Sequence, residues 1–343
     1  MSVYLSGLGC VTPWGMDLGE VYRRVAAGER VVGVDVENPE TGKKHPAALV
    51  PPAFTAHLGR EPRLRRASPV SMLAAAAGRA AMEQSGLVLD AATKARTALV
   101  FGVSSGGVQY TRRFYEQVVK QGANAASPML FPETVYNAPA SHLAAMLGLD
   151  GATYTLVGDG TVGLQALHFG AQLLEMGEAD QVLVVAAEEL DWILIEAHYD
   201  WRLTDPGALL AEGAAAVVLA RKGALRVHCP PGQSFVTRAG ARAAMDAALR
   251  GVAGGGQPDV LVDGCNDTWV DPVMRRAVAE AYPGWAPTQV LSPRRALGEA
   301  VGASSLLQVV LAAEALRQGE ARRALVAALG WNQQAAAAVM ERV

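Results

Sequence analysis

The sequence predicts an α/β protein with a mostly parallel sheet covered by helices on both faces. Short runs rich in valine and leucine alternate along the chain with longer, alanine-rich segments of helical periodicity. The chain has 343 residues, of which 51% are hydrophobic, and it is rich in alanine, valine, leucine and glycine. This composition suits a tightly packed α/β protein. The length fits two or three domain-sized units, or one large two-lobed domain.

The valine- and leucine-rich runs are the expected strands, and the periodic segments are the expected helices. The strands are Val3–Leu8, Thr97–Val103, Thr153–Val157, Gln181–Ala187, Ala214–Ala220, Leu225–His228, Asp259–Val262, Ala324–Ala328 and Ala336–Met340. The helices are Pro69–Gln84, Val108–Lys120, Ala138–Leu147, Thr161–Met176, Thr237–Arg250, Pro272–Tyr282 and Val301–Gln318. Strand and helix alternation of this kind is typical of a sheet that is buried on both faces.

One pattern occurs twice in the chain. Leu173–Gly177 ends a predicted helix and is followed by a short charged turn and a buried strand, and Ala315–Gly319 is followed in the same way. Glycine suits the left-handed residue just past a helix end, and we expect both glycines to take that conformation. Either the turn is simply reused, as in many α/β proteins, or the fold is duplicated. A duplication would divide the chain into residues 1–221 and 222–343.

Charge, cysteine content and the N-terminus exclude several classes of function. The net charge of -3 gives no indication of a nucleic-acid partner. The three cysteines have the spacing of neither a zinc site nor a disulfide framework, so we expect no metal and a reduced, cytoplasmic protein. The N-terminus reads as a strand rather than a signal peptide, and no apolar stretch is long enough to span a membrane. Nothing in the sequence indicates a cofactor.

The stretch from residue 27 to residue 66 is rich in proline, glycine and charge, and we expect it to be a surface loop. It ends in a basic cluster that includes Arg63, Arg65 and Arg66. Such a cluster is either a solvated face or a docking patch for an acidic partner, for example an acyl carrier protein.

Several motifs follow one another in a fixed order. They are Leu5-Ser-Gly-Leu-Gly-Cys-Val-Thr-Pro-Trp-Gly15, the alanine-rich segment from Arg65 to Ala77, Gly102-Val-Ser-Ser-Gly-Gly107, Phe131-Pro-Glu-Thr-Val-Tyr-Asn137, Gly163-Leu-Gln-Ala-Leu with Ala186-Ala-Glu188, and Ala211-Glu-Gly-Ala-Ala-Ala-Val-Val-Leu219. Together they resemble the β-ketoacyl synthase family along nearly the whole chain. The resemblance implies a thiolase-like fold, which is a duplicated five-layer α-β-α-β-α arrangement with mixed sheets. It also implies a homodimer or a heterodimer. The chain is shorter than a typical elongating ketosynthase, so we expect trimmed loops.

The resemblance places three substitutions where the family has its catalytic Cys-His-His triad. The family's nucleophilic cysteine follows a strand and precedes a helix, and here Val157-Gly-Asp-Gly160 puts Gly160 at that position. The neighbouring Asp159 is either a substitute carboxylate or the N-cap of the helix. The family's first histidine corresponds to Asp263, and its two nearby threonines correspond to Cys265 and Asp267.

The second histidine corresponds to Glu299, in Leu297-Gly-Glu-Ala-Val-Gly302, and the family's upstream lysine corresponds to Arg294 or Arg295. In the family both histidines donate hydrogen bonds to the thioester oxygen on which negative charge develops. Two carboxylates would oppose that charge, so we expect no condensation by this chain alone. The family's phenylalanine gate corresponds to Trp331, which either narrows the pocket or packs in the core.

These substitutions leave three hypotheses for the function. The first is a non-catalytic partner of an active ketosynthase, on the pattern of the chain-length factors of polyketide pathways, with a second copy of the chain as the alternative partner. The second is a repurposed enzyme in which Asp263 and Glu299 lie close together and, with Cys265 or Asn266, carry out acid–base chemistry on an acyl thioester. The third is a module that binds a small molecule or a carrier protein without chemistry.

Overall fold

The computed structural model describes residues 2–200, 208–319, 321–331 and 333–343. Its main strands are β1 (Val3–Val11), β4 (Thr97–Val103), β5 (Thr153–Val157), β6 (Gln181–Glu188), β8 (Gly213–Ala220), β9 (Leu225–His228), β11 (Val260–Val262), β12 (Gln289–Leu291), β13 (Arg323–Leu329) and β14 (Gln334–Arg342). Its helices are α1 (Leu18–Ala26), α2 (Pro69–Ser85), α3 (Ala91–Arg96), α4 (Val108–Gln121), α5 (Ala138–Leu147), α6 (Val162–Glu175), α7 (Trp192–Asp200), α8 (Ala241–Val252), α9 (Val270–Ala281), α10 (Pro293–Leu297) and α11 (Val301–Gln318). Each helix and strand expected from the sequence is present.

The sheet is mixed, and its two sides repeat one strand order. The order is β5-β4-β6-β8-β1 on one side and β12-β11-β13-β14-β9 on the other, and β1 and β9 join them as antiparallel neighbours. On each side three strands are parallel, and β8 or β14 then runs antiparallel to them. The expectation of a mostly parallel sheet therefore holds only for these triplets. The repeated order supports a duplicated fold, and the domain division at residues 221 and 222 stays a prediction.

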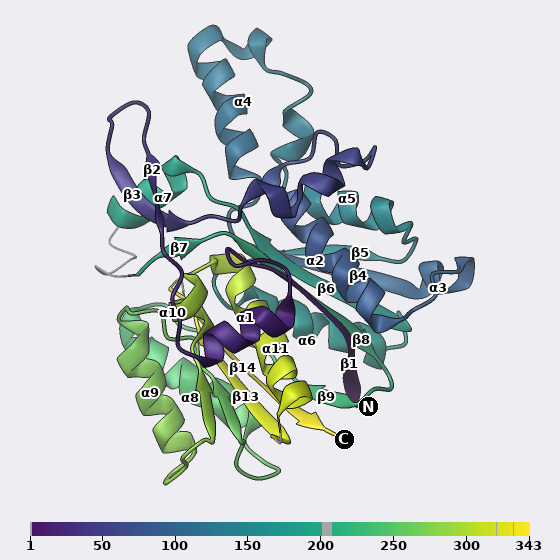
Figure 1. Ribbon diagram of the computed structural model, residues 1–343, viewed down its shortest axis with the longest axis vertical. Coiled ribbons are helices and arrows are strands. Elements are labelled where there is room, and N and C mark those ends of the chain that lie inside the picture. Colours follow the sequence, from purple (N-terminus) through teal and green to yellow (C-terminus); the bar gives the residue numbers. More distant parts are fainter. Residues whose placement is uncertain (1, 201–207, 320, 332) are drawn as a thin grey trace.

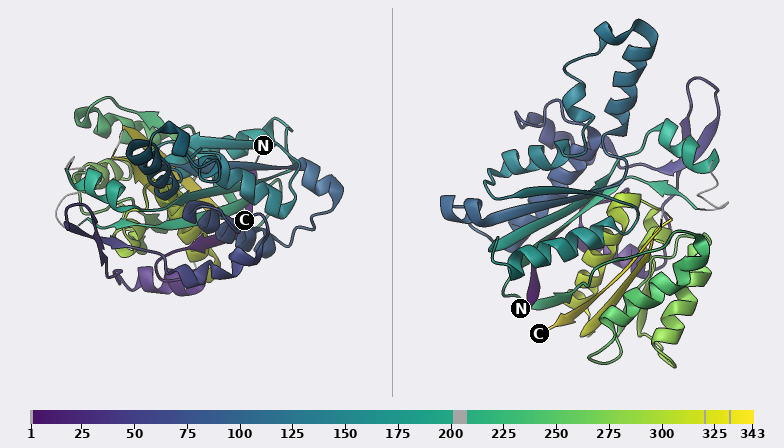
Figure 2. Two further views of the ribbon diagram at one scale, coloured as in Figure 1. Left: turned by 90° about the horizontal axis from the view of Figure 1, so that it is seen from above. Right: turned by 180° about the vertical axis from the view of Figure 1, so that it is seen from behind.

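The helices and the two sides of the sheet form five layers (Figures 1 and 2). Helix α2 covers β1, β6 and β8 on one outer face, and α8 and α9 cover β14 and β13 on the other. Helices α6 and α11 pack against each other between the two sides. Gly163 allows this close approach, because a Cβ atom there would lie 2.7 Å from the backbone nitrogen of Leu306. This is the thiolase-like arrangement that the sequence predicts.

The two glycines that end the repeated helices differ in conformation. Gly177 has φ 77°, as expected for a left-handed residue after a helix. Gly319 has φ -102° and ψ -179°, so the expectation of a left-handed residue is wrong there. The chain leaves α11 in an extended conformation that any residue could adopt.

The stretch from residue 27 to residue 66 is more ordered than its composition indicates. It contains a hairpin of β2 (Val34–Glu37) and β3 (Lys44–Ala48), and β3 also pairs with the short β7 (Leu210–Ala211). The hairpin lies beside α7 (Figure 1) and shares with it a small apolar cluster that includes Ala47 and Ile195.

The other elements include the short β10 (Gln233–Ser234). No described helix combines the length and the apolar character that crossing a bilayer requires.

Candidate functional site

A cavity of about 390 Å³ lies where the predicted site residues come together. Asp159 and Gly160 reach it from the turn before α6, Glu299 from the turn before α11, and Trp331 from the connection between β13 and β14. Leu194 and His198 of α7 complete one wall, with Ser104 and Ser105 after β4. The sequence-based assignment thus brings four of its candidates to one place, from segments far apart in the chain.

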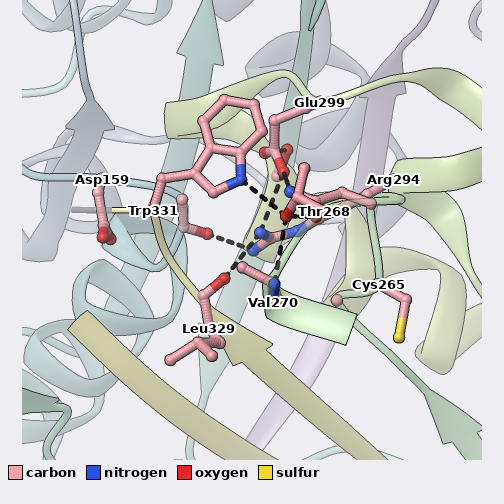
Figure 3. Close-up of polar contacts among 12 residues, drawn as sticks. Asp159, Cys265, Thr268, Val270, Arg294, Glu299, Leu329 and Trp331 are labelled. Atoms are coloured by element: carbon pink, nitrogen blue, oxygen red, sulfur yellow. Dashed lines mark hydrogen bonds and ion pairs between the residues drawn. The ribbon is translucent and has the colours of Figure 1, made fainter. Parts of the chain in front are cut away.

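The guanidinium group of Arg294 fills the space beside Gly160. A Cβ atom built on Gly160 would lie 3.1 Å from Nη1, 3.3 Å from Nη2 and 3.5 Å from Cζ of Arg294. Nη2 donates a hydrogen bond of 2.7 Å to the carbonyl oxygen of Gly160, and Nη1 donates one of 3.2 Å to that of Leu329 (Figure 3). A longer side chain at position 160 would therefore have to displace a buried cation.

Glu299 is the counter-ion of Arg294. Its Oε2 lies 3.1 Å from Nη1 of Arg294, and the two side chains are 1% and 2% exposed. Asn266 donates to the same oxygen at 2.8 Å, and Ser304 donates to Oε1 at 2.5 Å. Three donors thus satisfy this carboxylate, as a buried charge requires. Of the two arginines that could replace the family's lysine, Arg294 is the one in the site, whereas Arg295 pairs with Asp267 and Asp271 outside it.

Asp263 is buried in a different set of contacts from Glu299. Its carboxylate accepts a hydrogen bond of 3.2 Å from the backbone of Cys265. Burial raises the pKa of Asp263, against the opposing effects of a hydrogen bond from Ser292 and the charge of Arg295. The direct approach of the Asp263 and Glu299 carboxylates that the sequence suggested does not appear among the contacts of the described residues.

The other candidates near Asp263 have structural surroundings. Cys265 is fully buried, and burial, followed by the nearby charges of Asp263 and Asp271, raises the pKa of its thiol, which keeps it protonated. Asp267 forms ion pairs with Arg30 at 3.0 Å and Arg295 at 2.9 Å rather than facing the cavity.

Asp159 combines a place in the cavity wall with local hydrogen bonds to Thr161. Its Oδ1 accepts hydrogen bonds from the backbone nitrogen of Thr161 at 3.0 Å and from the Thr161 hydroxyl at 3.1 Å. This is the bonding of a turn that precedes α6, in which a side chain accepts from the backbone two residues on. The N-cap of α6 is Thr161, so the prediction of Asp159 as the N-cap is wrong, although its carboxylate bonds to that residue.

Trp331 lies over the buried ion pair and is connected to it (Figure 3). Its indole nitrogen donates a hydrogen bond of 3.3 Å to the hydroxyl of Thr268, which donates one of 2.6 Å to Asn266. The indole ring also lies 5.9 Å from the ring of His198 on α7. Burial lowers the pKa of His198, which favours its neutral form. Trp331 thus contacts both walls of the cavity.

Comparison with known proteins agrees with this geometry. A family model described as "Beta-ketoacyl synthase, N-terminal domain" matches residues 2–224. The chain belongs to the β-ketoacyl synthase family.

The named relatives of this ketosynthase family member are distant. The 3-oxoacyl-(acyl-carrier-protein) synthase 2 of Vibrio cholerae is 25% identical over 189 residues, which cover 54% of this chain and 45% of that protein, less than half its length. The protein of the same name from Coxiella burnetii is 22% identical over 93% of this chain and 86% of its own length. Nodulation protein E of a Rhizobium species is 23% identical, with coverage of 92% and 86%.

Solved structures of ketosynthases share the fold over its full length. "The ishigamide ketosynthase/chain length factor" superimposes with a TM-score of 0.84, 23% identity and full coverage of both chains. A ketosynthase in complex with its chain length factor from Xenorhabdus doucetiae gives a TM-score of 0.79 and 17% identity, covering 100% of this chain and 98% of that one. At these identities the likeness shows the fold.

Sequence reasoning missed a buried glutamate beside the ketosynthase-like cavity. Glu188 ends β6, and its carboxylate accepts backbone hydrogen bonds of 3.0 Å from Ser104, 2.9 Å from Ser105 and 3.0 Å from Gly302. It thereby ties the serine wall of the cavity to the start of α11. Its neighbour Glu189 accepts from the first turns of α2 and α4. The signal was two adjacent acidic residues directly after the apolar run from residue 182 to residue 187.

These two glutamates make stability depend on pH. Desolvation by burial raises the pKa of Glu188 to about 7 and that of Glu189 to about 8, from 4.5. A raised carboxyl pKa adds stability that is fully present below pH 4.5 and is lost as the pH rises through 7 and 8. We expect the free energy of unfolding to fall by roughly 2–3 kcal/mol between about pH 6.5 and 8.5, measured by urea denaturation. In Glu188→Gln and Glu189→Gln the free energy of unfolding should fall less over this pH range. An undiminished fall in both variants would show that these two carboxyl groups do not cause it.

Proposed function

We propose that this chain is a non-condensing ketosynthase-like subunit of a fatty acid or polyketide type pathway, and that it acts like a chain-length factor beside an active β-ketoacyl synthase. The observation that carries the proposal is the Arg294 guanidinium beside Gly160, at the position that the family resemblance assigns to the nucleophile. A glycine has no nucleophilic atom, and the space for one is occupied. The acyl-enzyme that begins condensation therefore cannot form at residue 160.

The charge distribution supports the same conclusion. Ketosynthase decarboxylation needs hydrogen-bond donors aimed at a developing oxyanion, and loss of one such donor already reduces a rate by about 10²–10³-fold. Here Asp263 and Glu299 are the residues at the positions assigned to the two histidines, and both are acceptors when ionised. The buried guanidinium that lines the cavity, that of Arg294, is already paired with Glu299. The three positions assigned to the family triad therefore supply neither a nucleophile nor an uncommitted oxyanion donor.

The surface of the subunit supports a partner. Strand β5 stands at one end of the strand order, so among the described strands it pairs with β4 alone, as an edge strand that could accept a further strand does. Large apolar side chains are exposed on β5 and on the segment before it, which includes the projecting helix α4 (Figure 1). They are Tyr115, Val119, Met129, Phe131, Val135, Tyr136, Tyr154 and Val157. Exposed apolar side chains at such density are typical of an interface. The exposed Arg63, Arg65 and Arg66 are the proposed docking patch for an acyl carrier protein.

The test is co-expression of this chain with the ketosynthases encoded in the same genome. We expect a heterodimer on size-exclusion chromatography with one of them, in preference to a homodimer. Val157→Asp should weaken association at least tenfold, because Val157 is 54% exposed on β5. Met176→Asp is the matched control, since Met176 is 70% exposed at the far end of α6. A stable homodimer without affinity for any of these ketosynthases would refute the partner role.

The alternative of a repurposed enzyme receives less support. It needs two carboxyl groups close enough to perturb each other's pKa. The carboxylate of Glu299 instead bonds to Arg294, Asn266 and Ser304. That of Asp263 bonds to the backbone of Cys265. The test of this alternative is turnover of acyl thioesters by the isolated chain, with Asp263→Asn and Glu299→Gln as controls.

A further inference from the structure

The indole of Trp331 is held by a hydrogen bond that a phenylalanine could not make. Its nitrogen donates to the Thr268 hydroxyl at 3.3 Å, and that hydroxyl also accepts from the backbone of Val270 at 3.3 Å. The Thr268 side chain is buried, whereas Trp331 is partly exposed. The donor of a partly exposed residue is therefore anchored on a buried one (Figure 3).

A chain of hydrogen bonds leads from Thr268 to the buried ion pair of Glu299 and Arg294. Thr268 donates to Asn266 at 2.6 Å, Asn266 donates to Glu299 at 2.8 Å, and Glu299 is paired with Arg294. Every link beyond Trp331 is buried, which shields these donors and acceptors from bulk water. The chain of bonds thus connects the outer tryptophan rigidly to the ion pair that fills the position beside Gly160.

The apolar contacts of Trp331 span the cavity. The ring packs against one cluster built from α8, α9 and β13, and against another that includes Ile195 of α7 and Val301. The indole nitrogen bonds to Thr268 near the first cluster, and the indole ring contacts His198 of α7 near the second. A ring free of the anchor could turn away from either side.

We propose that Thr268 is a latch that holds Trp331 closed over the cavity, and that breaking this hydrogen bond opens the cavity to a ligand. The inference goes beyond the partner role and does not depend on it. A neutral hydrogen bond contributes about 1 kcal/mol net, which corresponds to about a fivefold change in the open fraction.

The first test uses the unaltered chain. With ¹⁵N-labelled tryptophan, the indole resonance of Trp331 is identified as the one that disappears in Trp331→Phe. We expect its N–H to exchange with solvent several-fold more slowly than a solvent-exposed indole. Exchange as fast as that of free tryptophan would overturn the latch.

The second test measures opening itself. Ser104→Cys places a thiol in the cavity wall, and the three native cysteines are buried, so a charged methanethiosulfonate reagent reports access to the cavity. We expect Thr268→Val to speed this labelling about fivefold. Thr268→Ser, which keeps the hydroxyl, should leave the rate unchanged. Since Thr268→Val also removes the bonds to Asn266 and Val270, Trp331→Phe provides a second break of the latch with Thr268 intact. Equal labelling rates in Trp331→Phe and the parent would overturn the proposal.

Discussion

Glu299→Gln is expected to lower the free energy of unfolding by about 3–5 kcal/mol, because it leaves Arg294 as an unpaired charge in the protein interior. The side chains of Arg294 and Glu299 are only 1% and 2% exposed. The neutral amide can still accept from Asn266 and Arg294 through its oxygen and donate to the Ser304 hydroxyl, so the expected loss comes from the missing charge. Urea denaturation followed by circular dichroism measures the change.

The control is the double variant Arg294→Met with Glu299→Gln. It removes the charge of both partners while keeping similar volume, and replacement of a complete buried ion pair is often neutral or stabilising. We expect the double variant to be markedly more stable than either single variant, which gives a large coupling energy in the double-mutant cycle. Additive effects of the two substitutions would show that the ion pair is not the unit that holds this part of the site.

The strands and helices were predictable because each has a strong local pattern. The run Val182–Ala187 is apolar without interruption, and α11 carries small and aliphatic residues on every face, as burial between two sheet sides requires. The hairpin of β2 and β3 was missed because Lys44-His-Pro46 has the composition of a loop. Its pairing depends on tertiary contacts of β3 with β7 and of Tyr199 with His45, whose rings stack at 4.3 Å.

The candidate site could be located from the sequence, but not the contacts of its residues. Gly160 and Glu299 stand inside motifs that resemble those of the family, so they could be assigned to triad positions, and that assignment stays a prediction. The role of Arg294 could not be predicted, because it rests on contact with Gly160, 134 residues away along the chain. The distance between the carboxylates of Asp263 and Glu299 could not be predicted either, because two neighbouring turns can direct their side chains to different partners.

Gly160→Cys places a cysteine at the position that the family resemblance assigns to the nucleophile, and we expect that it does not restore condensation. The Cβ alone would lie 3.1 Å from Nη1 of Arg294, and the sulfur beyond it has to displace the guanidinium. Displacement breaks the bonds of Arg294 to Glu299 and to the Gly160 carbonyl oxygen. We expect a loss of several kcal/mol of stability, and no carbon–carbon bond formation from malonyl and acyl carrier substrates, assayed by mass spectrometry of the carrier-bound products.

Two controls separate the steric cause from the missing chemistry. Gly160→Ala adds only the Cβ, so it should reduce stability by about 1–3 kcal/mol, less than the cysteine does. Gly160→Cys combined with Arg294→Ala removes the obstruction, and its thiol should react with iodoacetamide. Condensation should still be absent, because Asp263 and Glu299, at the positions that the resemblance assigns to the two histidines, are acceptors when ionised. Measurable condensation by either cysteine variant would show that the carboxylates are not the barrier, and the non-condensing role would then rest on residue 160 alone.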